Sequence, residues 1–229
     1  MYTLYIANRN YSSWSLRPWV LMKQLGIAFE EKLQQFEAFS NFEKFRQFSP
    51  SGTVPCLVDG DIVIWDSLAI VEYLAERHIG VWSEDPAARA FSRSATAEMH
   101  SGFGALRSLC PMNCAISVEM NGIPGSLQQD IDRIDEIWSG GLEQFGGPFI
   151  GGADFSAVDA FFCPVAYRVS SYQLPVSAPA LAYSQRLLAL PAMQEWDAAA
   201  IRETWREERH EEEAAALGRV IEDRRDSPG

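Results

Sequence analysis

Two neighbouring serines, Ser12 and Ser13, stand between a short β-rich run and a helical pattern. A serine hydroxyl in this position can donate a hydrogen bond to an anion, which is worth roughly 1.5–3 kcal/mol for a charged acceptor. The N-terminus of the helix that follows adds about 0.3–1 kcal/mol. A serine before a helix can also serve only as its N-cap. The pair is therefore a candidate anion site with a structural alternative.

Two further places carry residues with chemical or conformational potential. Asp66-Ser67 marks a strand-to-helix turn, where the serine can hold a carboxylate and the aspartate can pair with an ammonium group. Both residues are also favoured N-caps. Val54-Pro55 stands at the start of a strand, and a cis bond there would turn the Val54 backbone outward. The structural alternative is an ordinary proline at a strand start.

The elements that position these residues alternate between strand and helix. The clearest signal is a hairpin, because the apolar runs 54–58 and 61–65 are joined through Asp59-Gly60. The other predicted elements of this half are strands at 3–7 and 29–33 and helices at 16–25, 41–48 and 68–77. The predicted order is β-α-β-α-β-β-α.

Beyond this half the strand patterns stop and only helical patterns follow. The predicted helices lie at 86–109, 127–145, 156–171, 180–190 and 193–221. The segment 202–226 is dense in both charge signs, which is typical of a solvated helix. With 78–85 as linker, the sequence predicts an α/β domain at 1–79 and an all-α domain at 86–229.

Composition narrows the classes of partner. The chain of 229 residues carries a net charge of -12, which argues against nucleic acid or an anionic membrane as partner. No apolar run approaches the length of a membrane span, and no secretory signal opens the chain. We therefore expect a cytoplasmic protein, and the net charge says little about small substrates.

The cysteines and histidines indicate neither disulfides nor a metal. The four cysteines form no CxxC pair, and reduced thiols are the simpler interpretation. Cys110 and Cys114 with the distant His100 are too few for a metal site, so we expect none. Cys56 follows Pro55 and is predicted to be a core residue.

Four segments, in order, resemble one family. Residues 12–17, SSWSLR, resemble the serine motif of zeta-class glutathione transferases and their bacterial relatives. Residues 51–55, SGTVP, resemble the loop that carries the cis-proline of glutathione transferases. Residues 66–70, DSLAI, resemble their (Glu/Gln)-Ser-x-Ala-Ile signature. Residues 156–159, SAVD, resemble the capping box that starts a buried helix, which we interpret as structural. The resemblance covers nearly the whole chain.

The resemblance implies a thioredoxin-like first domain, an all-helical second domain and glutathione as co-substrate. Ser12 or Ser13 would donate to the glutathione sulfur and hold it as the nucleophilic thiolate, and the spacing leaves open which one. It also implies a cis Val54-Pro55 bond, with the Val54 backbone pairing with the cysteinyl part of glutathione as an added strand would.

For the γ-glutamyl end, the resemblance implies that Ser67 holds the carboxylate and Asp66 the ammonium group. Asp66 is shorter than the usual Glu or Gln. For the glycine carboxylate the nearby cations are Lys32, Lys44 and Arg46, each of which can equally be an ordinary surface charge.

The implied function is a glutathione transferase, whose thiolate attacks an electrophilic small molecule. The electrophile would lie between Trp14 and second-domain residues such as Met99, Phe103 and Met112, which can equally be core. A zeta-like maleylacetoacetate isomerase is one alternative, favoured by the double serine but not by Trp14, where zeta relatives carry cysteine. A binding or regulatory protein of the same fold without turnover is another. The resemblance also implies a homodimer.

Overall fold

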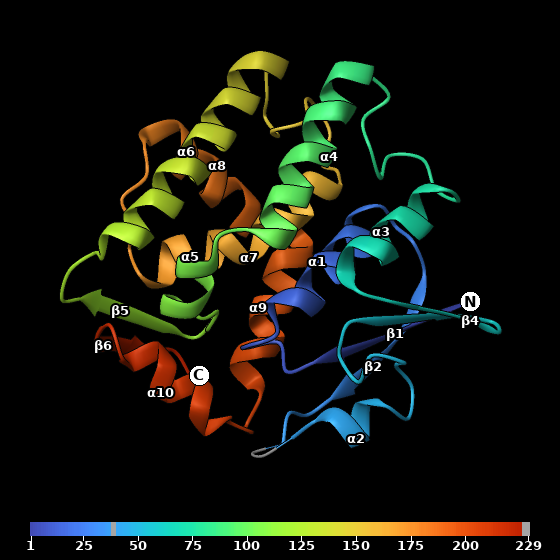
Figure 1. The fold of residues 1–229 in the computed structure, drawn as a ribbon, viewed down its shortest axis with the longest axis horizontal. Coiled ribbons are helices and arrows are strands. Elements are labelled where there is room, and N and C mark those ends of the chain that lie inside the picture. Colours follow the sequence, from blue (N-terminus) through green and yellow to red (C-terminus); the bar gives the residue numbers. More distant parts are fainter. Residues whose placement is uncertain (38–39, 226–229) are drawn as a thin grey trace.

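The computed structural model describes residues 1–37 and 40–225, and Figure 1 shows a sheet with its helices beside a larger helical part. The sheet has the strand order β2-β1-β3-β4. The edge pair of β2 and β1 is parallel, whereas the central pair of β1 and β3 and the other edge pair of β3 and β4 are antiparallel. The strands are β1 (Tyr2–Ala7), β2 (Phe29–Gln34), β3 (Cys56–Asp59) and β4 (Ile62–Trp65). The predicted hairpin at 54–65 is thus confirmed.

Three helices accompany this sheet: α1 (Ser13–Gln24), α2 (Phe42–Phe45) and α3 (Ser67–Ala75). Figure 1 shows α1 and α3 between the sheet and the helical part, with α2 on the opposite side. Helix α1 begins three residues earlier than the predicted start at Leu16. Ser13 is therefore the first helical residue and Ser12 is the N-cap position.

The helical part is built around a buried central helix. Its helices are α4 (Pro86–Ser101), α5 (Gly104–Leu109), α6 (Gly125–Phe145), α7 (Ala157–Ser171), α8 (Ala178–Leu188), α9 (Pro191–Arg202) and α10 (Glu208–Ala215). Helix α7 buries all of its residues except Ser170 and packs against α1, α4 and α8. A helix that is apolar on nearly every side belongs in a core, which explains this position.

The start of α7 depends on Asp159. Its buried carboxylate accepts hydrogen bonds from the N–H of Ser156 at 2.9 Å, the N–H of Ile150 at 3.2 Å and the hydroxyl of Tyr183 at 2.7 Å. Burial raises the pKa of Asp159 from its ordinary 3.8 to about 6. The predicted capping box is present, and it also ties α8 and the preceding loop to α7.

Two predictions for the second half are wrong in part. The single helix predicted over 86–109 is interrupted at Gly102-Phe103, where Phe103 adopts a left-handed backbone with φ of 56°. A Cβ on Gly102 would meet the carbonyl oxygen of Glu98 at 2.8 Å, so the tight exit from α4 requires glycine.

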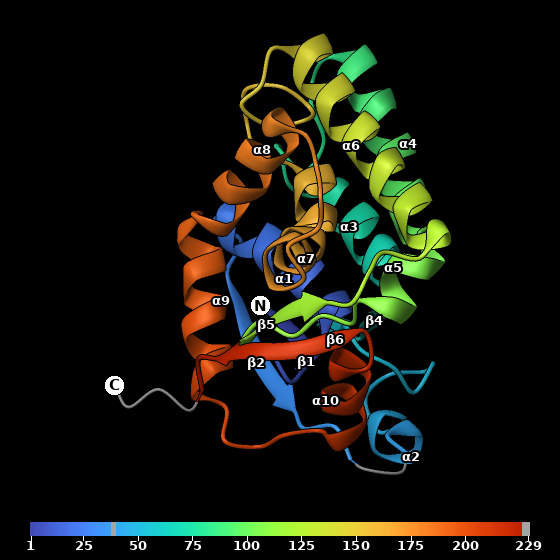
Figure 2. The same ribbon diagram turned by 90° about the vertical axis from the view of Figure 1, so that its left-hand side faces the viewer.

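The second half is also not purely helical. Strand β5 (Ile116–Met120) pairs antiparallel with β6 (Gly218–Asp223), so the segment predicted as one solvated helix contains α10 and a strand instead. Figure 2 shows this two-stranded ribbon below α7, with α10 beside it. Long-range pairing overrides helical patterning here, because β6 satisfies the backbone groups of β5 about a hundred residues away. Within residues 1–37 and 40–225, no helix is long and apolar enough to cross a membrane.

Candidate functional site

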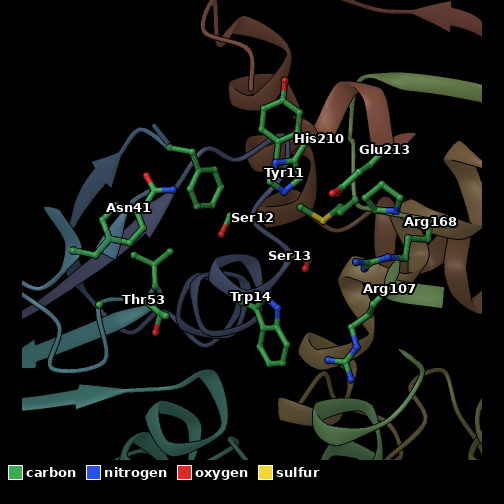
Figure 3. Close-up of a pocket in the computed structure, with 16 residues that line it drawn as sticks. Tyr11, Ser12, Ser13, Trp14, Asn41, Thr53, Arg107, Arg168, His210 and Glu213 are labelled. Atoms are coloured by element: carbon green, nitrogen blue, oxygen red, sulfur yellow. The ribbon is translucent and has the colours of Figure 1, made fainter. Parts of the chain in front are cut away.

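A cavity of about 410 Å³ lies where the first domain's loops meet the helical part (Figure 3). Its walls come from the turn before α1, the loop before β3, α5 with the loop after it, α7 and α10. The lining residues are Tyr11, Ser12, Ser13, Trp14, Phe36, Asn41, Phe45, Gly52, Thr53, Val54, Arg107, Pro111, Met112, Arg168, His210 and Glu213. The structure therefore brings together three of the predicted site residues, Ser12, Ser13 and Val54.

Ser12 occupies the N-cap position without acting as a cap. Its hydroxyl makes no hydrogen bond to an α1 backbone N–H and donates instead to Oγ of Ser15 at 2.7 Å. Ser15 Oγ in turn accepts the N–H of Ala7 at 3.2 Å. The proton of Ser12 is thus engaged inside the protein, and its hydroxyl links α1 to the end of β1.

Ser13 is in a different situation. It is the first residue of α1, and among the described residues its hydroxyl has no hydrogen-bond partner. In Figure 3 its Oγ faces the cavity from the helix N-terminus. A free hydroxyl and a helix N-terminus that face the same space together favour an anion there. Of the two serines, Ser13 is therefore the one whose hydroxyl can donate a hydrogen bond to a ligand.

Val54 precedes a cis peptide bond to Pro55, as predicted. Val54 lines the cavity and Pro55 is buried beneath it. No hydrogen bond within the described residues uses the Val54 N–H or C=O. A backbone donor and acceptor left open beside a cavity can pair with an extended ligand as one more strand.

Asp66 and Ser67 do not line this cavity. Asp66 is the N-cap of α3 and accepts the N–H of Leu68 at 2.8 Å, while its other oxygen lies 3.5 Å from Nε2 of His100. Its backbone has φ of 75° and ψ of 135°, a strained combination for a residue with a side chain, and such strain gathers at functional sites. Ser67 is fully buried.

Arg17 connects these two regions. Its guanidinium is buried, lies 4.1 Å from the ring centroid of Trp14 and donates to Oγ of Ser67 at 3.4 Å. It also lies 4.7 Å from the ring of Phe161 on α7. Burial, with Arg107 and Arg168 nearby, lowers its pKa well below the usual range. The arginine thus joins the turn at Ser13, the start of α3 and the central helix.

The roof of the cavity comes from the C-terminal segment, which sequence reasoning missed. The imidazole of His210 stacks on Tyr11, with ring centroids 5.1 Å apart, and on Phe36 at 5.7 Å. Its Nδ1 lies 2.5 Å from a carboxylate oxygen of Glu207. The hydroxyl of Tyr11 also donates to Glu211 of α10. Tyr11 precedes the serine pair, so α10 is attached directly to the candidate site.

The cations predicted for a glycine carboxylate lie elsewhere. Lys32 pairs with Glu30, Lys44 donates to the carbonyl of Gln35 at 2.8 Å, and Arg46 donates to the carbonyl of Pro50. These three cations are absent from the cavity lining.

Of the three second-domain residues predicted as a wall, Met112 lines the cavity, whereas Met99 and Phe103 are core.

The cysteines take no part in the cavity. All four are free and buried, and burial raises the pKa of Cys56 to about 11.

Comparison with known proteins gives this geometry a family context. Residues 11–77 match the family model for the N-terminal domain of glutathione S-transferases. A probable maleylacetoacetate isomerase of Caenorhabditis elegans is 26% identical over 181 residues, which cover 76% of this chain and 81% of that protein. A stringent starvation protein A homolog of Pasteurella multocida is 27% identical over 152 residues, covering 66% and 67%.

The fold agrees with solved structures. A maleylacetoacetate isomerase of Methylobacterium extorquens AM1, crystallised with malonate and glutathione, superimposes with a TM-score of 0.64 at 23% identity over 88% of this chain and 97% of that one. The predicted thioredoxin-like part followed by a helical part is therefore confirmed, apart from the β5–β6 ribbon. The family match thus covers residues 11–77, and the likeness to solved glutathione transferase structures shows the fold of the chain.

Proposed function

We propose that this protein is a glutathione transferase that holds the glutathione thiol as thiolate for attack on an electrophilic small molecule. The observation that carries the proposal is the free hydroxyl of Ser13, at the N-terminus of α1, in the same cavity as the open Val54 backbone. Glutathione laid along Val54 as an added strand would bring its cysteinyl sulfur toward Ser13.

The energies suffice for this role. A free thiol has a pKa of about 8.5, and one pKa unit corresponds to about 1.36 kcal/mol. The Ser13 hydroxyl, at roughly 1.5–3 kcal/mol, and the helix N-terminus, at about 0.3–1 kcal/mol, could together lower it by about one to three units. In this proposal Ser13 donates to the sulfur, and Ser12 supports the turn through its hydrogen bond to Ser15.

The γ-glutamyl end belongs to the start of α3. Ser67 would offer its backbone N–H and its hydroxyl proton to the carboxylate, while its hydroxyl oxygen accepts from Arg17. Asp66 would pair with the ammonium group through the oxygen that faces His100. These two residues lie outside the cavity lining, so the ligand would extend from the cavity along α3.

The proposal extends to organisation. Residues 1–79 would be the glutathione-binding domain and 86–229 the domain carrying the electrophile wall, a division favoured by the end of α3 at Ala75 and the start of α4 at Pro86. We also propose that the protein is cytoplasmic and forms a homodimer. Sedimentation of the purified protein tests the dimer.

The experiment is calorimetric titration with glutathione and with S-methylglutathione on the wild type, Ser13→Ala and Ser12→Ala. We expect the wild type to prefer the free thiol at pH 7. Ser13→Ala should lose that preference while still binding both ligands, and Ser12→Ala should keep most of it. Equal binding of both ligands by the wild type would contradict thiolate activation.

A binding or regulatory protein without turnover is the second candidate. The likeness to a stringent starvation protein A homolog and the burial of the Ser67 hydroxyl favour it. Glutathione binding with normal thiol preference, but no consumption of glutathione with any of a panel of electrophiles, would move the assignment to this candidate.

A further inference from the structure

The cavity wall contributed by α7 carries a cation that no carboxylate of the described chain neutralises. Arg168 is only 4% exposed. Its Nε donates to the carbonyl of Cys110 at 2.7 Å and its Nη1 to the carbonyl of Pro164 at 3.1 Å. Both acceptors are neutral, so they orient the guanidinium without compensating its charge. Nη2 has no partner among the described residues, and in Figure 3 the guanidinium points toward Ser13.

A second arginine on the same wall also donates only to neutral groups, although the charge of Asp130, which accepts the N–H of Leu106, acts on it without forming an ion pair. Arg107 of α5 donates to the carbonyls of His100 and Gly102, again neutral groups, and its guanidinium lies 5.2 Å from the ring centroid of Trp14. Among the described lining residues the one carboxylate is Glu213, and it already accepts a hydrogen bond from Arg209 at 2.7 Å. The wall therefore has two guanidiniums and no free carboxylate.

A buried cation without a paired counterion is costly, so an anion that binds beside it is favoured. Burial lowers the pKa of Arg168 to about 10, with Arg107 contributing to the shift, yet the group stays protonated at neutral pH. Two guanidiniums on one wall suit a carboxylate, because each presents a planar set of donors that matches its oxygens. Pro111 and Met112 beside them offer an apolar surface to the rest of such a molecule.

We propose that the electrophile of this protein is a small hydrophobic carboxylic acid, whose carboxylate is held by Arg107 and Arg168 and whose reacting carbon faces Ser13. The inference rests on the proposed function, since it takes the thiolate to be at Ser13. It makes the two arginines specificity-determining residues. They select for charge through contacts that a neutral analogue cannot make.

A matched pair of probes separates charge from shape. The charged probe is 4-chloro-3,5-dinitrobenzoate. The glutathione thiolate sulfur forms a bond to its chlorine-bearing carbon, and chloride leaves with the electrons of the broken bond. The proton lost by the thiol goes to solvent. The corresponding benzamide reacts in the same way but has no charge. Rates of both are measured as kcat/KM and divided by their uncatalysed rates with glutathione.

We expect the wild type to favour the acid over the amide by at least about tenfold, the range that one charge-assisted contact supplies. Arg168→Met and Arg107→Met should each reduce this ratio toward one through loss of the acid's rate, and Arg168→Lys should retain part of it. Arg219→Met, which removes the same charge from an exposed site on β6, should leave the ratio unchanged. The exposed part of Arg107 makes its variant the safer one if Arg168→Met does not fold.

Binding of S-(4-carboxybenzyl)glutathione and S-benzylglutathione, measured by calorimetry on the same proteins, makes the two failures distinguishable. Turnover with an acid-to-amide ratio near one would overturn this inference and leave the proposed transferase standing. No turnover, but an arginine-dependent preference for the carboxybenzyl ligand, would overturn the transferase and retain the carboxylate site. No preference in either assay overturns the inference.

Discussion

The two walls of the cavity are built by different means. The wall from the first domain consists of the turn before α1 and the loop before β3, and it offers a hydroxyl from Ser13 and backbone groups from Val54. The facing wall consists of α5, α7 and the loop between α5 and β5, and it offers the guanidiniums of Arg107 and Arg168. One wall is made of loop segments of the first domain and is uncharged, whereas the other is made of helices of the second domain and carries two cations.

This difference fits a division of labour. A ligand common to many reactions is well served by backbone groups, because side-chain substitution alters them little. A wall made of side chains from several helices can change with each substitution, so it can define the second substrate. The comparison predicts that substitutions in the helical wall change stability or substrate specificity. Substitutions in the first wall should change the binding of glutathione.

The largest effect should come from the support of the helical wall. The pKa of Asp159 rises from 3.8 in the unfolded chain to about 6 in the fold. Between these values the folded state binds more protons, so the free energy of unfolding falls as pH rises from about 4 to about 6. At about 1.36 kcal/mol per unit, the loss is roughly 3 kcal/mol.

Asp159→Asn cannot titrate, so the stability difference between wild type and variant should shift against the wild type by that amount over the same pH range. Urea unfolding of both proteins at several pH values between 4 and 7.5 measures it. Parallel stability curves would show that the buried carboxylate has no raised pKa.

The next effect concerns Asp66 at the start of α3, outside the cavity lining, where the γ-glutamyl end of glutathione is proposed to bind. Asp66→Asn keeps the size and the acceptor for the Leu68 N–H but removes the charge proposed to pair with the ammonium group. We expect glutathione and S-methylglutathione to bind about tenfold more weakly, by the same factor, because the thiol is not involved. Calorimetry measures both affinities. Asp61→Asn, on the exposed hairpin turn, is the matched control. An equal loss of affinity in that variant would mean that Asp66 does not contact the ligand.

A smaller effect should follow from loosening the roof that spans both walls. Tyr11→Phe removes the hydroxyl that donates to Glu211, a carboxylate also held by Arg225 at 2.6 Å. We expect the free energy of unfolding to fall by about 0.5–1.5 kcal/mol and proteolysis within 203–225 to become faster. Limited digestion followed by mass spectrometry locates the cut. Tyr73→Phe, which removes a hydrogen bond to Asp59 on the far hairpin, should not change cleavage in that segment.

The smallest effect is expected at Lys44, one of the cations predicted for the glycine carboxylate of glutathione. Lys44 is engaged by the carbonyl of Gln35 and by Glu37 at 3.2 Å, and it does not line the cavity. Lys44→Met should therefore change glutathione affinity by less than about twofold, as is usual for a surface ion pair. A clear loss of affinity would mean that the side chain leaves its present partners to bind the ligand.

Local signals were enough for the first domain. Asp59-Gly60 between two apolar runs determined the β3–β4 hairpin, and the serine and Asp-Ser pairs marked the starts of α1 and α3. The alternation Ile116-Ser117-Val118-Glu119-Met120 could have revealed β5, because apolar and polar residues alternate along it. Its partner β6 had no such signal, since a strand held by pairing needs little pattern of its own.

By itself, then, the sequence determined the order of elements in the first domain and the turn that carries the serines, while the cis bond at Val54-Pro55 was expected only through the family resemblance. Only the tertiary structure decided that the Ser12 hydroxyl donates to Ser15, whereas the Ser13 hydroxyl has no partner among the described residues. Only it decided that Arg107 and Arg168 face the same cavity. The reason is range: caps, turns and hairpins depend on neighbours within a few residues, whereas a charge left without a counterion is a property of everything packed around it.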